Sequence, residues 1–123
     1  MSVKTYSNKK LLEQLSLAIQ DKMALGKVDI KTLADQLAIS TCQLNRRVKE
    51  ATGLTSSDFV LSARLARAKR LLAQFPEITI FEIAHQCGFA DTAHFSHVFK
   101  RKVGLSPTQF VFRLQFQKIP QKE

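Results

Sequence analysis

Two cysteines and three histidines are the side chains of this sequence that could act in covalent or metal chemistry. Cys87 lies within ten residues of His85, His94 and His97. A cysteine nucleophile would need an exposed thiol beside a histidine base, and zinc would need four ligands that converge tetrahedrally. The spacing matches no familiar structural zinc site, and Cys87 aligns with Leu37 in an internal repeat, which predicts a core position. We therefore expect a protein that is not an enzyme, with no metal, no cofactor and two unpaired thiols.

A second set of polar side chains has the types and spacing to bind the edges of DNA bases. Leu44, Val48 and Ala51 follow a helical period and are expected to face inward. The opposite face of that helix then carries Cys42, Asn45, Arg46 and Lys49. Arginine can make a bidentate pair with guanine, and asparagine can make one with adenine. A small side chain such as that of Cys42 can contact a thymine methyl group.

The same pattern recurs 51 residues later. Identical residues at this offset include the pairs Thr41/Thr92, Lys49/Lys100, Gly53/Gly104, Leu54/Leu105, Phe59/Phe110 and Val60/Val111. The matched outer face carries Ala93, Ser96, His97 and Lys100, and the expected inward set is Phe95, Phe99 and Val103. Each unit consists of a short helix, a tight turn and a longer helix that ends at glycine. This is the organisation of a helix-turn-helix, whose second helix enters the major groove.

The two units differ in the chemistry of their outer faces. Ser96 is an unselective hydrogen-bonding partner, and His97 can donate to a guanine acceptor, so we predict that the first unit reads bases more strictly. Phosphate contacts are expected from helix N-termini, which favour anions, and from hydroxyl and cationic side chains. The candidates are Thr41, Thr92, Lys100, Arg101 and Lys102.

Charge supports a polyanionic partner. The 123 residues include 19 Lys and Arg against 10 Asp and Glu, for a net charge of +9. Between Thr92 and Lys122 there are six basic residues and no acidic one. Such a surface attracts nucleic acid, although an ordinary solvated basic surface is the alternative. No apolar run approaches the roughly 18 residues of a membrane span, and the first residues do not resemble a secretory signal. We expect a cytoplasmic, nucleoid-associated protein without a membrane partner.

The elements that must position these side chains are seven helices and no sheet. Capping boxes are expected at Ser40–Gln43 and Thr79–Glu82, a cap at Asp91, and a last helix that starts at Ser106. We expect a flexible arm over residues 1–7, a first helix-turn-helix subdomain over 8–54, a linker helix over 55–75, a second subdomain over 76–117 and a flexible tail over 118–123. The expected fold class is all-α, with two helix-turn-helix subdomains joined by a long linker helix.

One stretch resembles a known family signature. Residues 88–107, GFADTAHFSHVFKRKVGLSP, look like the signature of the AraC/XylS family of bacterial transcription regulators. LADQLAISTCQLNRRVKEATG is similar to the family's first helix-turn-helix, and ARLARAKRLL (63–72) is similar to its linker helix. The resemblance implies two recognition helices in successive major-groove segments of one DNA face. The base-facing positions it implies are Cys42, Asn45 and Arg46 in the first unit, and Thr92, Ala93, Ser96 and His97 in the second.

The sequence departs from the family pattern at two places. His97 stands where arginine is common, and the aromatic-Arg pair that usually follows the final proline appears as Phe110-Val111, with the arginine displaced to Arg113. The family occurs as stand-alone activators and as the C-terminal domain of longer regulators. One alternative is therefore an output domain that is specific only together with a sensor or receiver domain of a longer chain. Another is a protein-interaction module that uses the aromatic segment FVFRLQF (110–116). RNA polymerase and an N-terminal sensor or receiver domain are candidate partners besides double-stranded DNA.

Overall fold

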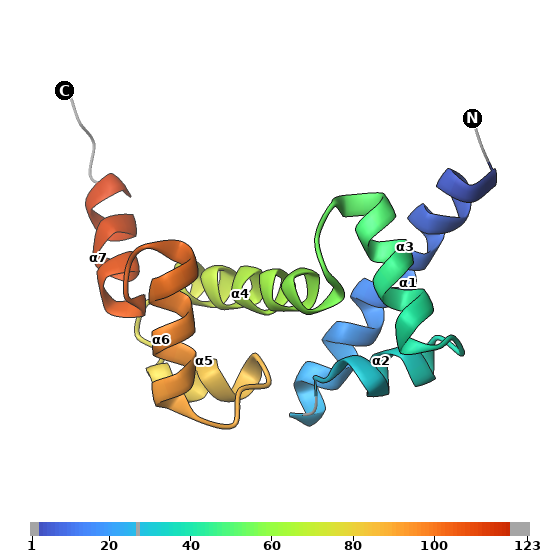
Figure 1. Ribbon diagram of the computed structural model, residues 1–123. Helices are drawn as coiled ribbons and strands as arrows, with labels where there is room; N and C mark the ends of the chain where they lie inside the picture. The colour runs from blue at the N-terminus through green and yellow to red at the C-terminus, as the bar shows by residue number, and fades with distance from the viewer. Residues whose placement is uncertain (1–2, 27, 119–123) are drawn as a thin grey trace. The chain divides into compact units, whose positions relative to one another are not determined.

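The computed structural model describes residues 3–26 and 28–118, and these form seven α-helices with no strand among them (Figure 1). The helices are α1 (Val3–Leu25), α2 (Ile30–Gln36), α3 (Thr41–Thr52), α4 (Ser56–Gln74), α5 (Ile80–Gln86), α6 (Thr92–Val103) and α7 (Pro107–Lys118). The expected all-α fold is confirmed. Within these described ranges, no helix is both long enough and apolar enough to cross a membrane.

Side-chain caps start several of these helices where the sequence places them. Ser40 Oγ accepts a hydrogen bond from the backbone N–H of Gln43 at 3.0 Å, at the start of α3. Asp91 caps α6 by accepting from two backbone N–H groups. At the start of α7, Ser106 and Gln109 cap each other at 3.1 and 2.9 Å, which is a reciprocal capping box. These local bonds satisfy N–H groups that a helix otherwise leaves unpaired.

Two helices start at positions that the sequence analysis did not indicate. The structure continues α1 back to Val3, into the segment where a flexible arm was expected. Asn8 is buried and accepts a hydrogen bond from Arg47 Nε at 3.0 Å, which ties the first turns of α1 to α3. A helix anchored in this way propagates at little further cost. α2 starts at Ile30 because Asp29 caps it, a signal that the sequence reading missed. Residues 1–2 and 119–123 of the expected arm and tail lie outside the described residues.

The chain divides into two compact units, one ending at Arg64 and the other beginning at Leu65, so the division falls inside α4. In the first unit, α1 packs against both α2 and α3. Its core is aliphatic. The most deeply buried large side chains are Leu15, Ile19, Leu33, Leu44 and Val48.

In the second unit, α6 packs against α5 and α7. Its core contains a chain of aromatic contacts. The ring centroids of Phe89 and Phe95 are 5.2 Å apart, those of Phe95 and Phe99 are 5.7 Å apart, and those of Phe99 and Phe110 are 5.6 Å apart. Edge-to-face and tilted arrangements at such distances are favourable beyond their buried area. The last of these contacts fixes one face of α7 on α6.

Candidate nucleic-acid interface

The turn between α2 and α3 sets the start of the first candidate recognition helix. Ala38 occupies the left-handed region with φ of 62°, and the N–H of Ile39 donates to the carbonyl of Ala34 at 3.1 Å. The matched turn of the second unit has Gly88 at φ of 79°, and the N–H of Phe89 donates to the carbonyl of Ala84 at 2.9 Å. The two units therefore enter their longer helices through the same backbone geometry.

On α3, the polar face expected from the sequence is exposed. Leu44 and Val48 are fully buried. The candidate residues Thr41, Cys42, Asn45, Arg46 and Lys49 are all exposed. The prediction that Ala51 faces inward was wrong, because Ala51 is exposed. In the last turn Thr52 is half-buried instead, and its hydroxyl donates to the carbonyl of Val48 at 2.8 Å.

The exposed polar face of α6 is narrower than that of α3. Ala93, His97, Lys100 and Arg101 are exposed, whereas Thr92 and Ser96 are half-buried. Phe95 and Phe99 are fully buried as expected, and Val103 is half-buried. Val98 is also buried, which the sequence reading missed although it lies three residues after Phe95. Partial burial of Thr92 and Ser96 leaves fewer exposed polar residues on α6 than on α3.

Asn45 has a structural partner that competes with its expected role. The backbone N–H of Ser56, the first residue of α4, donates to Asn45 Oδ1 at 3.3 Å. A bidentate contact with adenine needs this same oxygen as the acceptor for the base's amino group. Ser56 is fully buried, and its side-chain Oγ has no hydrogen-bond partner among the described residues. The side chain of Asn45 therefore accepts a hydrogen bond from the first backbone N–H of α4, within the first unit.

Neighbouring cations have different environments. Arg46 is exposed, whereas Arg47 is half-buried and donates to Asn8. On α4, Arg67 Nε donates to the backbone carbonyl of Gln86 at 3.2 Å, at the end of α5. The structure uses Arg67 to hold the end of α5.

The cysteine and histidine side chains do not form a reactive group. Cys87 is fully buried, and Cys42 is an exposed thiol on α3. The three histidines are exposed, and two of them contact aromatic rings, His85 with Phe81 and His94 with Phe89. Over residues 3–26 and 28–118, no three His, Cys, Asp or Glu side chains lie close enough together to hold a metal ion. Burial of Cys87 also removes the exposed thiol that nucleophilic catalysis requires.

Paired helix-turn-helix units with exposed polar faces define a class of DNA-binding domain. Residues 33–113 match a family model described as a helix-turn-helix domain. The chain belongs to the AraC/XylS family of helix-turn-helix transcription regulators, whose members are not enzymes. The family expected from the signature at residues 88–107 is confirmed.

Curated relatives are transcription activators. The chain is 36% identical over 103 residues to the HTH-type transcriptional activator RhaS of Enterobacter sp. (strain 638), a match that covers 84% of this chain and 36% of the relative. It is 38% identical over 89 residues to RhaS of Escherichia coli (strain K12 / DH10B), covering 72% and 31%. The chain thus spans about a third of the length of these relatives.

Two solved structures of domains from transcription regulators have a similar fold. The DNA-binding domain of the global transcriptional factor AdpA, solved in complex with a target DNA, matches with a TM-score of 0.76 and 26% identity, over 91% of this chain and 97% of that one. The C-terminal domain of the two-component response regulator YesN from Fusobacterium nucleatum matches with a TM-score of 0.74 and 27% identity, over 83% and 98%. These likenesses favour DNA binding over a protein-interaction module as the main function.

Proposed function

We propose that this chain is the sequence-specific, double-stranded DNA-binding domain of a transcription regulator, with α3 and α6 as recognition helices in successive major-groove segments. The observation that supports it most strongly is the exposed polar face of α3 over buried Leu44 and Val48, repeated 51 residues later on α6. In this proposal residues 8–54 and 76–117 are the two subdomains, and α4 is the linker helix. The chain has a net charge of +9, and its Lys and Arg side chains would neutralise DNA phosphates.

The side chains divide by chemistry. Arg46 is the main base-reading residue, through a bidentate pair with guanine. His97 donates to a base acceptor, and Cys42 and Ala93 contact thymine methyl groups. Phosphate contacts, which fix position without specifying sequence, are assigned to Thr41, Lys49, Thr92, Lys100 and Arg101. We assign Asn45 and the half-buried Ser96 mainly to positioning their helices, with any base contact secondary.

The candidate partners follow from the relatives. RhaS is named a transcriptional activator, and the YesN match is the output end of a two-component regulator. We therefore propose a sensor or receiver domain and RNA polymerase as further partners, and the cytoplasmic nucleoid as the place of action. Two units in one chain suffice for an asymmetric DNA site, so the proposal does not require a dimer.

Selection of bound duplexes from a random DNA pool, with affinity followed against salt, tests this function. We expect two short motifs about 10 base pairs apart, because that spacing presents successive major grooves on one face, and a steep salt dependence. Enrichment of one motif would mean that only one unit reads bases. Weak, salt-sensitive binding without enrichment would contradict specific recognition by this chain alone.

A further inference from the structure

Helix α7 leaves a row of aromatic side chains uncovered. Phe112 is 70% exposed and Phe116, one helical turn later, is 57% exposed. On another face of the same helix, Phe110 packs against Phe99 of α6. α7 is therefore held in the unit through one face and presents aromatic surface on another. Two large exposed aromatic side chains on adjacent turns form a patch, and such patches mark interaction sites more often than single exposed residues do.

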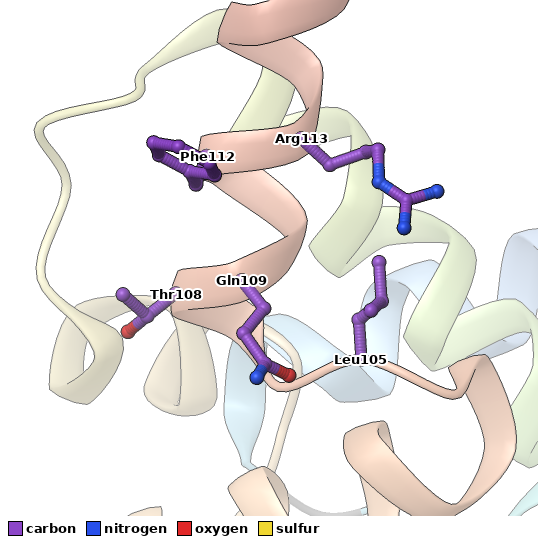
Figure 2. A pocket seen from close by; sticks show the side chains of 5 residues that line it. All are labelled: Leu105, Thr108, Gln109, Phe112 and Arg113. Atoms are coloured by element: carbon purple, nitrogen blue, oxygen red, sulfur yellow. The ribbon is translucent and has the colours of Figure 1, made fainter.

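Hollows flank Phe112 on both sides. The first, of about 470 Å³, is lined by Leu105, Thr108, Gln109, Phe112 and Arg113 (Figure 2). In Figure 2 the Arg113 side chain points toward Leu105, and Thr108 and Phe112 lie on the other side.

The second hollow has a volume of about 370 Å³ and lies on the other side of the Thr108–Phe112 ridge, since both residues line both hollows. Its apolar wall comes from Leu72, Pro76, Ile78, Ile80 and Val111. A ridge between two hollows suits a partner whose side chains enter both.

Among the residues that the structure describes, the lining of the first hollow carries positive charge. Arg113 is the charged residue that the described part of the chain contributes to this lining. The last turn of α6 adds Lys100, Arg101 and Lys102, after which the chain turns at Gly104 and reaches Leu105 in the hollow's wall. Residues 92–122 include no acidic residue. The chemistry that complements the first hollow is apolar and negatively charged.

We propose that α7 and its two hollows dock an acidic amphipathic helix of a partner protein. The apolar face of that helix would cover Phe112 and place side chains in both hollows, in the helix-in-groove mode. Its carboxylates would pair with the exposed Arg113, and arginine and aromatic side chains are enriched among the residues that carry most of the binding energy of an interface. An anionic membrane fits less well, because an interfacial helix buries one continuous apolar face, and Gln109 and Gln115 interrupt this one. The proposal goes beyond DNA binding, since Phe112 lies outside both recognition helices.

The test uses a synthetic helical peptide of roughly 20 residues, with leucines at positions i, i+3, i+4 and i+7 and glutamates on its other faces. A matched peptide carries lysine in place of every glutamate. Fluorescence anisotropy of the labelled peptides measures binding to the full chain. We expect the acidic peptide to bind and the basic one not to bind. Phe112→Gln should weaken binding about tenfold or more, and Arg113→Glu should weaken it by about tenfold.

Two variants serve as matched controls. Phe81→Gln removes an aromatic side chain of α5 that is 68% exposed and lines neither hollow, and Arg70→Glu reverses an exposed charge on α4. Both should bind the acidic peptide as the wild type does. Phe112→Gln should keep its helical circular dichroism and its DNA affinity, which separates this proposal from the DNA-binding one. If Phe112→Gln does not fold, Phe116→Gln takes its place and should also weaken peptide binding.

Several results would overturn the proposal. These are equal binding of the acidic and basic peptides, equal losses in Phe81→Gln and Phe112→Gln, or no binding of the acidic peptide. Dimerisation in sedimentation experiments that Phe112→Gln abolishes would show that a second copy covers the surface. Binding to phosphatidylserine vesicles that Phe112→Gln abolishes would identify a membrane instead.

Discussion

In each helix-turn-helix unit another helix follows the recognition helix, α4 after α3 and α7 after α6. These two following helices start in different ways. In the first unit, Ser56 is the first residue of α4, and its backbone N–H donates to Asn45 Oδ1. At the matched positions of the second, α7 starts with Pro107 and the residue on α6 is Ser96. Proline has no N–H to satisfy and is favoured at the first helical position, so no amide side chain is needed there. A residue on a recognition face can therefore belong to a helix junction.

The cores of the units differ as well. At the offset of 51, Leu44 and Val48 of the first unit correspond to Phe95 and Phe99 of the second, and all four are fully buried. Only in the second unit do these positions belong to a continuous chain of ring contacts, which ends at Phe110 on α7. Equivalent positions should therefore contribute unequally to stability.

Truncation of the two matched core residues should show this inequality as the largest effect. Phe99→Ala removes a fully buried ring with two aromatic neighbours, so we expect a loss of about 3–5 kcal/mol in the free energy of unfolding. Val48→Ala removes two methyl groups and should cost about 2 kcal/mol. Urea unfolding followed by circular dichroism measures both. Equal losses would mean that the second unit collapses around the missing ring and that the aromatic contacts of Phe99 contribute little to stability.

The outer faces of the two units should also contribute unequally. Arg46→Ala should weaken binding to a selected duplex by about 1–3 kcal/mol and spare a scrambled one, because it removes a bidentate base contact. His97→Ala should have the same sign with a smaller loss. Lys49→Ala, a cation on the same face as Arg46, should weaken both duplexes alike, as loss of a phosphate contact does. Anisotropy titrations at one salt concentration measure all three. Equal losses on both duplexes for Arg46→Ala would rule out base reading by that residue.

Helix ends and the repeat could be predicted from the sequence because both depend on local chemistry. Ser40, Asp91 and Ser106 lie at caps whose partners are two or three residues away. The exposed face of α3 followed from the helical period alone. Such signals involve one turn of chain and do not need the tertiary fold.

Apart from the local cap at Asp29, the features that sequence reading missed depend on distant contacts or on packing. Asn45 pairs with a residue 11 positions later, and Arg47 pairs with Asn8, 39 positions earlier. The helical period predicted that Ala51 faces inward, but it does not show where the neighbouring helices end. For the same reason it did not predict that Val98 is buried. Periodicity gives the direction of a side chain, but packing decides whether another element covers it.

A double-mutant cycle tests whether Asn45 belongs to the helix junction. Asn45→Ala leaves the N–H of Ser56 without its acceptor, so we expect a loss of about 1 kcal/mol in unfolding free energy. In a Ser56→Pro background, which copies Pro107, the same change should cost little. The coupling energy would then be about 1 kcal/mol. Cys42→Ala, on the same face of α3, should show no coupling to Ser56→Pro. Equal losses from Asn45→Ala in both backgrounds would mean that Asn45 does not stabilise the junction through the N–H of Ser56.

The smallest expected difference lies in the turns. Ala38 has φ of 62° where the second unit has Gly88, and an alanine in the left-handed region is strained by roughly 1–2 kcal/mol. Glycine removes that strain but loses more backbone entropy on folding, so Ala38→Gly should raise the unfolding free energy by about 0.5 kcal/mol. Ala51→Gly makes the same substitution at an exposed position in regular helix α3, and should lower it by about 0.5–1 kcal/mol. Opposite signs in urea unfolding would show that backbone conformation at Ala38 sets the effect. A loss from Ala38→Gly would show that entropy outweighs the strain at this turn.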